Sequence, residues 1–303
     1  MSFRKEHHQN LKVTTEFNTS GSNLSEYSID QLKNMWRDTL NKGMHGICFS
    51  MYEDGQEPGD TITEEQVEKR IKILKPYTKW IRSFSCIEGN EHIPKLAKKH
   101  GIKTMVGAWL GADLEKNEKE IEALIELGNQ GLVDIAAVGN EVLYRDELSI
   151  EQLIGYLNRV KNALPQVQVG YVDAYYKFSK YPELVEACDV ILSNCYPFWE
   201  GCPIDYSIHH MKKMYNQAKS VSQGKKVIVT ETGWPNEGGS EGGANASEAN
   251  AMKYFINTQV WSANDNIDVF YFSSFDESWK VGAEGDVGAY WGLWDKDEKL
   301  KYQ

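Results

Sequence analysis

Two glutamates can do chemistry together, because each follows a short apolar run with the character of a buried strand. Glu231 lies in VIVTETGWP (227–235), where a β-branched run is stopped by glycine and proline. Glu141 follows VDIAAVG (133–139) and Asn140. Continuous apolar runs are typical of parallel strands buried on both faces. If both strands belong to one closed parallel barrel, both carboxylates lie at its carboxyl-terminal end, which is the functional face.

A pair of carboxylates facing each other across a barrel mouth is what cleavage of a glycosidic bond requires. One carboxyl group protonates the departing oxygen, and the other attacks or assists at the sugar carbon. Hydride transfer and phosphoryl transfer do not need such a pair. The alternative, that Glu141 and Glu231 are solvated loop residues, does not account for their shared position at strand ends.

The elements that must position these glutamates are eight strand-like runs that alternate with helical patterns. The expected strands span 46–50, 80–84, 102–110, 133–139, 167–173, 189–196, 227–229 and 268–275. This alternation in about 300 residues predicts an α/β fold, a single (β/α)8 TIM barrel. The glutamates then follow strands 4 and 7.

Helices are predicted between the strands, and two begin with capping-box patterns, Thr63 with Gln66 and Ser149 with Gln152. A helix over 29–40 precedes the first strand. Only about 28 residues follow the eighth strand, so we expect the eighth helix to be short or missing and the N-terminal helix to cover part of the gap. The predicted domains are a polar, irregular lead over 1–27 and a catalytic barrel over 28–303.

Composition excludes several classes of partner. A net charge of −11 and a pI near 5.2 repel phosphate backbones and anionic membranes, so we expect no nucleic-acid or membrane partner. The run GICFSMYED lacks the glycine-rich turn of a dinucleotide site, and no GxSxG or HExxH motif occurs. We therefore expect no cofactor and no metal, and a monomer. The adjacent His209 and His210 fall on a predicted outer helix and are expected to be exposed.

Three further expectations come from residue counts and from the first residues. Nine tryptophans and sixteen tyrosines offer flat faces for stacking on sugar rings, or pack in the core. Five cysteines without a CxxC pair predict reduced, mostly buried thiols. The polar start, SFRKEHHQN after Met1, has no signal-peptide character. We expect a cytoplasmic protein, or a periplasmic or secreted one if residues have been removed before Met1.

Four motifs resemble glycoside hydrolase family 17, the β-1,3-glucanase family. They are AVGNEVL (137–143), NCYPFWEG (194–201), TETGWPNEGG (230–239) and SFDESWK (274–280). The resemblance runs from Gly43 onward and is greatest to the compact bacterial and fungal branch, through GICFSMYEDGQEPG, KPYTKWIRSFSC and WGLWD. It implies Glu141 as general acid/base and Glu231 as nucleophile of a retaining mechanism, with carboxyl groups roughly 5–5.5 Å apart. The pKa of Glu141 should then be raised by its surroundings and by the charge on Glu231.

The resemblance also implies substrate-binding groups around the pair. Asn140 would hold the sugar hydroxyl next to the reacting carbon, and Tyr196 would hydrogen-bond the nucleophile. Arg82 would stabilise the nucleophile electrostatically or form a structural ion pair. About half of a further set at strand ends is expected to contact sugar and the rest to pack: Trp109, Asp173, Tyr175, Phe198, Trp199, Trp234 and Phe275.

Two positions after strand 8, Glu277 and Lys280, match an acidic and a basic position of the plant members. They are expected to grip hydroxyls or to pair with each other. Phe49 stands where plant members have a tyrosine. Three functions follow in order: a retaining hydrolase of β-1,3-glucosidic bonds in β-glucan or laminari-oligosaccharides, a transglycosylase using the same covalent intermediate, and an inactive sugar-binding barrel.

Overall fold

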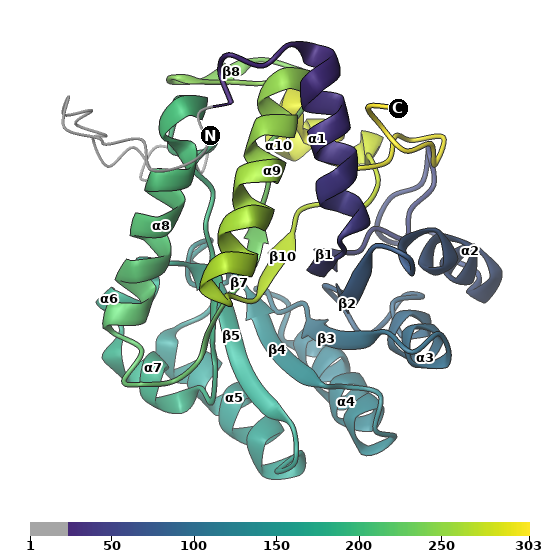
Figure 1. The fold of residues 1–303 in the computed structure, drawn as a ribbon. Helices are drawn as coiled ribbons and strands as arrows, with labels where there is room; N and C mark the ends of the chain where they lie inside the picture. The colour runs from purple at the N-terminus through teal and green to yellow at the C-terminus, as the bar shows by residue number, and fades with distance from the viewer. Residues whose placement is uncertain (1–23) are drawn as a thin grey trace.

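The computed structural model describes residues 24–303, so the predicted polar lead lies outside the described residues except for its last four positions. Eight parallel strands close into a barrel in the order β1-β10-β7-β6-β5-β4-β3-β2, with helices around it (Figure 1). The predicted (β/α)8 barrel is thereby confirmed. Its strands are β1 (Met44–Cys48), β2 (Thr78–Arg82), β3 (Lys103–Ala108), β4 (Ile135–Asn140), β5 (Gln168–Ala174), β6 (Ile191–Asn194), β7 (Val227–Thr232) and β10 (Val269–Tyr271).

Several predicted strand boundaries are wrong at the mouth of the barrel. The eighth strand was expected to reach Phe275, but β10 ends at Tyr271. Beyond it, the amide of Ser273 donates to the carbonyl of Trp291 at 3.0 Å and that of Ser274 to the carbonyl of Cys48 at 3.0 Å. Residues 272–275 are thus buried without belonging to the strand ladder, which is why a pattern of buried residues overestimates the strand.

The helices follow the predicted alternation. They are α2 (Glu64–Leu74), α3 (His92–Lys99), α4 (Leu114–Asn129), α5 (Ile150–Ala163), α6 (Lys177–Lys180), α7 (Pro182–Ala187), α8 (Ile204–Ser220) and α9 (Glu248–Asp265). Ser149 and Gln152 form the predicted capping box at the start of α5. At α2 the box is only half formed. Thr63 accepts from the amide of Gln66, whereas the Gln66 side chain donates to the carbonyl of Met51 at 2.7 Å and ties down the loop after β1.

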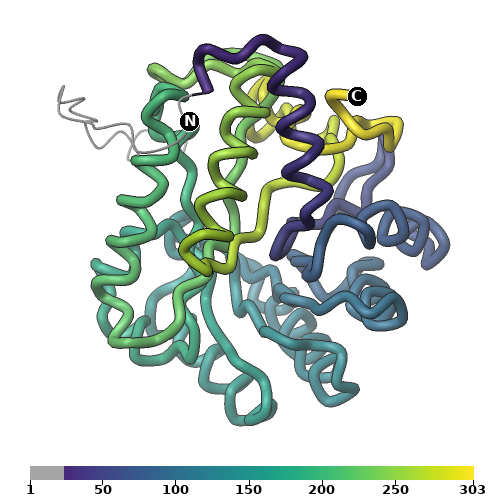
Figure 2. Tube along the Cα trace, viewed as in Figure 1, coloured from purple at the N-terminus to yellow at the C-terminus, as the bar shows by residue number. Residues whose placement is uncertain are grey.

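The eighth helix is reduced to short pieces, as predicted. After β10 come η1 (Ser278–Lys280), α10 (Val281–Glu284) and η2 (Asp286–Ala289). The N-terminal helix α1 (Ile29–Asn41) lies against α9, beside the gap that a full eighth helix would fill (Figures 1 and 2). Trp36 of α1 is fully buried, with ring centroids 5.5 Å from Phe255 and 5.1 Å from Tyr302. The helix that precedes the barrel therefore closes its wall.

A two-stranded hairpin, which the sequence did not predict, lies in the glycine-rich segment after β7. Its strands are β8 (Ser240–Glu241) and β9 (Ala244–Asn245), and they pair antiparallel. The amide of Gly243 donates to the carbonyl of Gly201 at 2.9 Å, which joins this hairpin to the loop after β6. Trp234 Nε1 donates to the carbonyl of Asn245 at 2.9 Å. Two loops at the barrel mouth are thus fixed to each other.

The interior is apolar and close-packed, and the cysteines belong to it. All five are buried free thiols, which confirms the expectation of reduced, buried cysteines. Among residues 24–303, no helix has the length and apolar character needed to cross a membrane.

Candidate active site

The end of β4 is shaped to present Glu141. Gly139 and Glu141 both have positive φ, 85° and 52°, and the pairing of β4 with β5 shifts register between Ala137 and Asn140. A Cβ on Gly139 would lie 3.3 Å from the ring of Tyr171, so glycine suits this position in conformation and in space. Irregularities of this kind redirect side chains at strand ends, and a positive φ at a non-glycine residue is a feature of functional sites.

Glu231 at the end of β7 is held by three donors. Arg82 Nη1 lies 2.6 Å from its Oε1, Tyr196 donates its hydroxyl to Oε2 at 2.8 Å, and Asn194 Nδ2 lies 3.1 Å from Oε1. The glutamate is buried. An ionised carboxylate only accepts hydrogen bonds, so three donors around a buried carboxylate favour its charged form. A fixed, charged carboxylate is the state that a nucleophile requires.

Glu141 has the opposite electrostatic surroundings. Burial of its carboxyl group, reinforced by the negative charges of Glu231 and Asp173, raises its pKa from 4.5 to about 8. The side chain therefore carries a proton near neutral pH, as a general acid must. Two carboxyl groups with such different surroundings divide the roles of acid and nucleophile between them.

One amide connects the two carboxyl groups. Asn194 Nδ2 lies 2.8 Å from Oε1 of Glu141 and 3.1 Å from Oε1 of Glu231. The two oxygens are therefore at most about 6 Å apart, which agrees with the close spacing of a retaining pair. Asn194 was not among the predicted site residues. It opens the motif NCYPFWEG, so the signal was present, but only the pairing of β6 with β7 places it beside Glu231.

Arg82 and Asn140 lie together beneath the mouth. Arg82 Nη2 donates to Oδ1 of Asn140 at 2.7 Å, and its guanidinium lies 4.3 Å from the centre of the Phe84 ring. Arg82 is 1% exposed and forms a buried ion pair with Glu231, so the two expectations for it coincide, and it is too deeply buried to contact sugar itself. Asn140 is 8% exposed, and its backbone carbonyl accepts a hydrogen bond from Arg145 Nη1 at 2.6 Å.

The predicted aromatic and acidic contacts divide into two groups. Four members of the set are fully or almost fully buried and therefore pack or support the site: Phe198, Trp234, Phe275 and Asp173. Trp109 is 38% exposed and Trp199 is half-buried, whereas Tyr175 is buried, with 7% exposed and its hydroxyl bonded to Glu200.

Asp173 supports the loop that carries Glu141. It accepts a hydrogen bond from the hydroxyl of Tyr171, whose oxygen in turn accepts from the amide of Leu143 at 2.9 Å. Burial raises the pKa of Asp173 to about 6. Asp173 is fully buried, and its negative charge is one of the causes that raise the pKa of Glu141.

Of the two expectations for Glu277 and Lys280, the structure shows pairing. Lys280 Nζ forms an ion pair with Glu277 and lies 4.3 Å from the centre of the Phe272 ring. Phe49, at the position of the plant tyrosine, is buried.

Trp291 is a residue of the site that sequence reasoning missed. It is 3% exposed, and its ring centroid lies 5.6 Å from Tyr196, 5.2 Å from Trp199 and 5.8 Å from Phe272. It therefore packs directly behind the tyrosine that donates to Glu231. The signal was the terminal WGLWD, but no helix or strand pattern indicated where this tail returns.

The prediction that both histidines of α8 are exposed is wrong for His210. His209 is exposed, but His210 is buried, with 8% exposed, and its Nε2 lies 2.6 Å from Oε2 of Glu200. The hydroxyl of Tyr175 donates to Oε1 of the same glutamate at 3.0 Å. The buried carboxylate of Glu200 thus joins α8 to the loops after β5 and β6. It also gives His210 a polar partner, which makes burial of this histidine possible.

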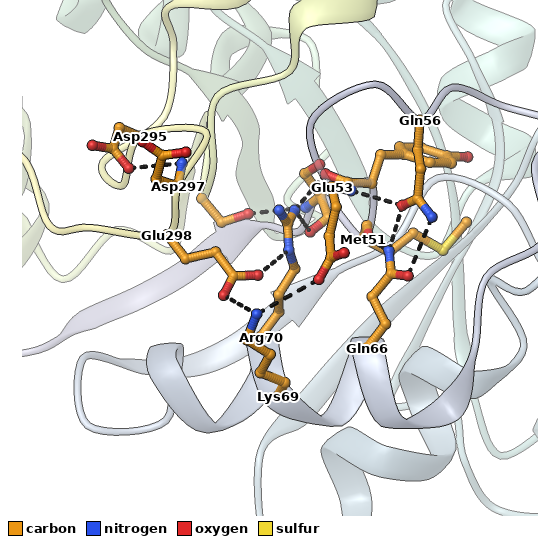
Figure 3. A network of polar contacts seen from close by, with 12 residues as sticks. Met51, Glu53, Gln56, Gln66, Lys69, Arg70, Asp295, Asp297 and Glu298 are labelled. Carbon is orange, nitrogen blue, oxygen red and sulfur yellow. Dashed lines mark hydrogen bonds and ion pairs between the residues drawn. The ribbon is translucent and has the colours of Figure 1, made fainter.

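Arg70 anchors the loop after β1 to the C-terminal tail (Figure 3). This fully buried arginine of α2 donates to the carbonyls of Ser50 at 3.2 Å and Tyr52 at 2.6 Å, and to Oε1 of Glu298 at 3.0 Å. The exposed Lys69 beside it also reaches Glu298, at 2.6 Å. One side chain therefore fixes the loop after β1 to the C-terminal tail.

Within the described part of the chain, no group of three or more His, Cys, Asp or Glu is arranged to hold a metal ion. The chemistry described above needs only the two carboxyl groups and their donors.

Comparison with known proteins gives consistent results. The family model described as "BtgE/BtgC glycoside hydrolase domain" matches residues 46–292. A glucan 1,3-beta-glucosidase from Arthroderma benhamiae is 29% identical over 80% of this chain and 85% of that protein, and one from Saccharomyces cerevisiae is 25% identical over 80% and 86%. The crystal structure of a glycoside hydrolase family 17 beta-1,3-glucanosyltransferase from Rhizomucor miehei is 30% identical, covers 86% of this chain and 96% of that one, and has a TM-score of 0.77. The predicted family resemblance is confirmed.

Proposed function

Because the chain belongs to the BtgE/BtgC glycoside hydrolase domain family, we propose that it is a retaining enzyme that cleaves β-1,3-glucosidic bonds in β-glucan or laminari-oligosaccharides. The observation that carries the proposal is the shared amide: Asn194 Nδ2 lies 2.8 Å from Glu141 and 3.1 Å from Glu231. Carboxyl groups this close leave no room for the water that an inverting enzyme places between sugar and base. The names of the relatives support the β-1,3 linkage.

The proposed reaction has two steps. In the first, an oxygen of Glu231 bonds to the anomeric carbon while the glycosidic bond breaks and Glu141 gives its proton to the departing oxygen. In the second, Glu141 takes a proton from water as the water oxygen bonds to the same carbon, and the ester to Glu231 breaks. Two inversions give net retention. The raised pKa of Glu141, about 8, suits its role as acid in the first step.

A second candidate is transfer of the glucosyl unit to another sugar. It uses the same ester, with a sugar hydroxyl in place of water in the second step. The observation that favours it is the likeness to the Rhizomucor miehei glucanosyltransferase, which is 30% identical with a TM-score of 0.77.

Incubation with a pure β-1,3-linked glucose pentamer tests both candidates. Products are separated by length, and the anomer formed first is followed by proton NMR. Shorter products in the β configuration are expected for the hydrolase, and products longer than the pentamer would indicate transfer. An α anomer as the first product contradicts the retaining mechanism. Cleavage of another linkage in the absence of β-1,3 cleavage contradicts the substrate class.

A further inference from the structure

Asn194 lies where β6 and β7 meet the two carboxyl groups. It is 2% exposed, and it faces Glu231 across the β6–β7 pairing, at a point where the register shifts. Its Nδ2 carries two hydrogens and has two carboxyl oxygens within reach, one on Glu141 and one on Glu231. Each hydrogen can therefore serve a different carboxyl group.

The orientation of this amide is fixed by a third residue. Thr230, the buried neighbour of Glu231 in β7, donates its hydroxyl to Oδ1 of Asn194 at 2.8 Å. If the amide were reversed, its oxygen would face the carboxyl oxygens, its nitrogen would lose both carboxyl acceptors, and the hydroxyl hydrogen of Thr230 would lose its acceptor. The hydroxyl on one side and the two carboxyl groups on the other thus select the same orientation.

We propose that Asn194 is a positioning residue that holds the carboxyl groups of Glu141 and Glu231 toward one sugar carbon, and that Thr230 keeps its amide in the donating orientation. The proposal rests on the function proposed above. It extends that function to Asn194, which contacts the acid and the nucleophile, and to Thr230, which contacts Asn194.

Such an amide serves both steps of the reaction. Before the first step the negative charge is on Glu231, and once the ester has formed it is on Glu141. A hydrogen bond to a charged carboxylate is stronger than one to a neutral carboxyl group, so the amide stabilises whichever group is charged. Loss of Asn194 should therefore disfavour the ionised form of Glu141 and raise its pKa further, because this hydrogen bond opposes the effect of burial.

Two variants and one matched control test the proposal. Asn194→Ala removes the donor. Thr230→Val removes the orienting hydroxyl at nearly constant shape. Thr232→Val is the control, since Thr232 is equally buried on the other side of Glu231 in β7 and its hydroxyl contacts Tyr254, away from the carboxyl pair.

The first readout needs no substrate. The pKa of Glu141 is obtained from the pH dependence of the difference in melting temperature between each variant and the same variant carrying Glu141→Gln. We expect Asn194→Ala to raise this pKa by about half a unit to one unit, and Thr230→Val to raise it less. Thr232→Val should leave it unchanged.

The second readout is kcat/KM on the β-1,3-linked pentamer. We expect a loss of about 10- to 100-fold for Asn194→Ala, mainly in kcat, and a smaller loss for Thr230→Val. The proposal is overturned if Asn194→Ala changes neither the pKa nor kcat/KM by more than twofold, or if Thr232→Val matches Thr230→Val. Should Asn194→Ala fail to fold, an unchanged pKa in Thr230→Val overturns it alone. If the wild type cleaves no β-1,3 linkage, the proposed function fails, while the first readout still decides the role of Asn194.

Discussion

Arg82 Nη1 lies 2.6 Å from Oε1 of Glu231, inside the barrel and out of contact with solvent. This ion pair makes the two carboxyl groups of the site unequal. Glu231 faces a permanent positive charge, whereas Glu141 faces the negative charges of Glu231 and Asp173. Since an arginine stays charged at any working pH, the division of roles is built into the barrel and does not depend on the substrate.

Substitution of either glutamate should reveal its role. Glu231→Ala removes the nucleophile, so activity should fall by at least about 1000-fold on any β-glucoside. Glu141→Ala should lose similar activity on a natural β-1,3 oligomer, but retain ester formation with a dinitrophenyl glucoside, whose departing group needs no proton. Initial rates and the presteady-state burst of dinitrophenol measure this difference. Equal losses on both substrates for both variants would contradict the assignment.

The pH profile should have its alkaline limb set by Glu141. Its pKa is raised to about 8, and the acid role needs the proton, so kcat/KM is retained below that pH and lost above it. The loss should approach tenfold for each pH unit above the limb. Rates across pH 5–10 on an oligomer check this, and an alkaline limb near the ordinary pKa of a glutamate would disagree with the buried site.

The same shift predicts a dependence of stability on pH. The pKa of Glu141 is higher in the folded protein, about 8, than its ordinary value of 4.5. Its contribution to stability is therefore fully present below pH 4.5 and lost as the pH rises through 8. Glu141→Gln cannot ionise, so at pH 9 it should be more stable than the wild type, by an amount on the order of a few kcal/mol. Urea unfolding at pH 5 and pH 9 measures the difference, and a stability gain of equal size at both pH values would refute it.

Sequence patterns were sufficient for the barrel and the pair, because apolar runs and strand ends are local features. Glu141 and Glu231 were identified from the runs that precede them. The rest of the site depends on register and on the return of the tail. Asn194 reaches both carboxyl groups only because β6 and β7 shift register there, and Trp291 reaches Tyr196 from a segment without periodicity. Burial could not be read from position, since Phe198 follows a strand end as Trp109 does, yet one is fully buried and the other exposed.

Trp109 should act as a stacking surface for sugar. It is 38% exposed at the end of β3, and the guanidinium of Arg145 lies 4.7 Å from the centre of its ring. Trp109→Ala should raise KM by about fivefold with little change in melting temperature, because an aromatic face contributes on the order of 1 kcal/mol. Trp109→Phe keeps a ring and is the control. If alanine and phenylalanine variants bind oligomers as well as the wild type, Trp109 does not contact sugar.

Arg70 should be a main determinant of stability outside the catalytic pair. Arg70→Met removes the donor to the carbonyls of Ser50 and Tyr52 and leaves Glu298 without its buried partner, so we expect a loss of about 2–4 kcal/mol in the free energy of unfolding. Lys69→Met is the matched control. It breaks an ion pair to the same glutamate, but the lysine side chain is 59% exposed, and such pairs contribute less than about 1 kcal/mol. Urea unfolding of both variants at one pH compares them directly. Equal losses would mean that the charge on Glu298, and not the burial of Arg70, holds the loop after β1 to the tail.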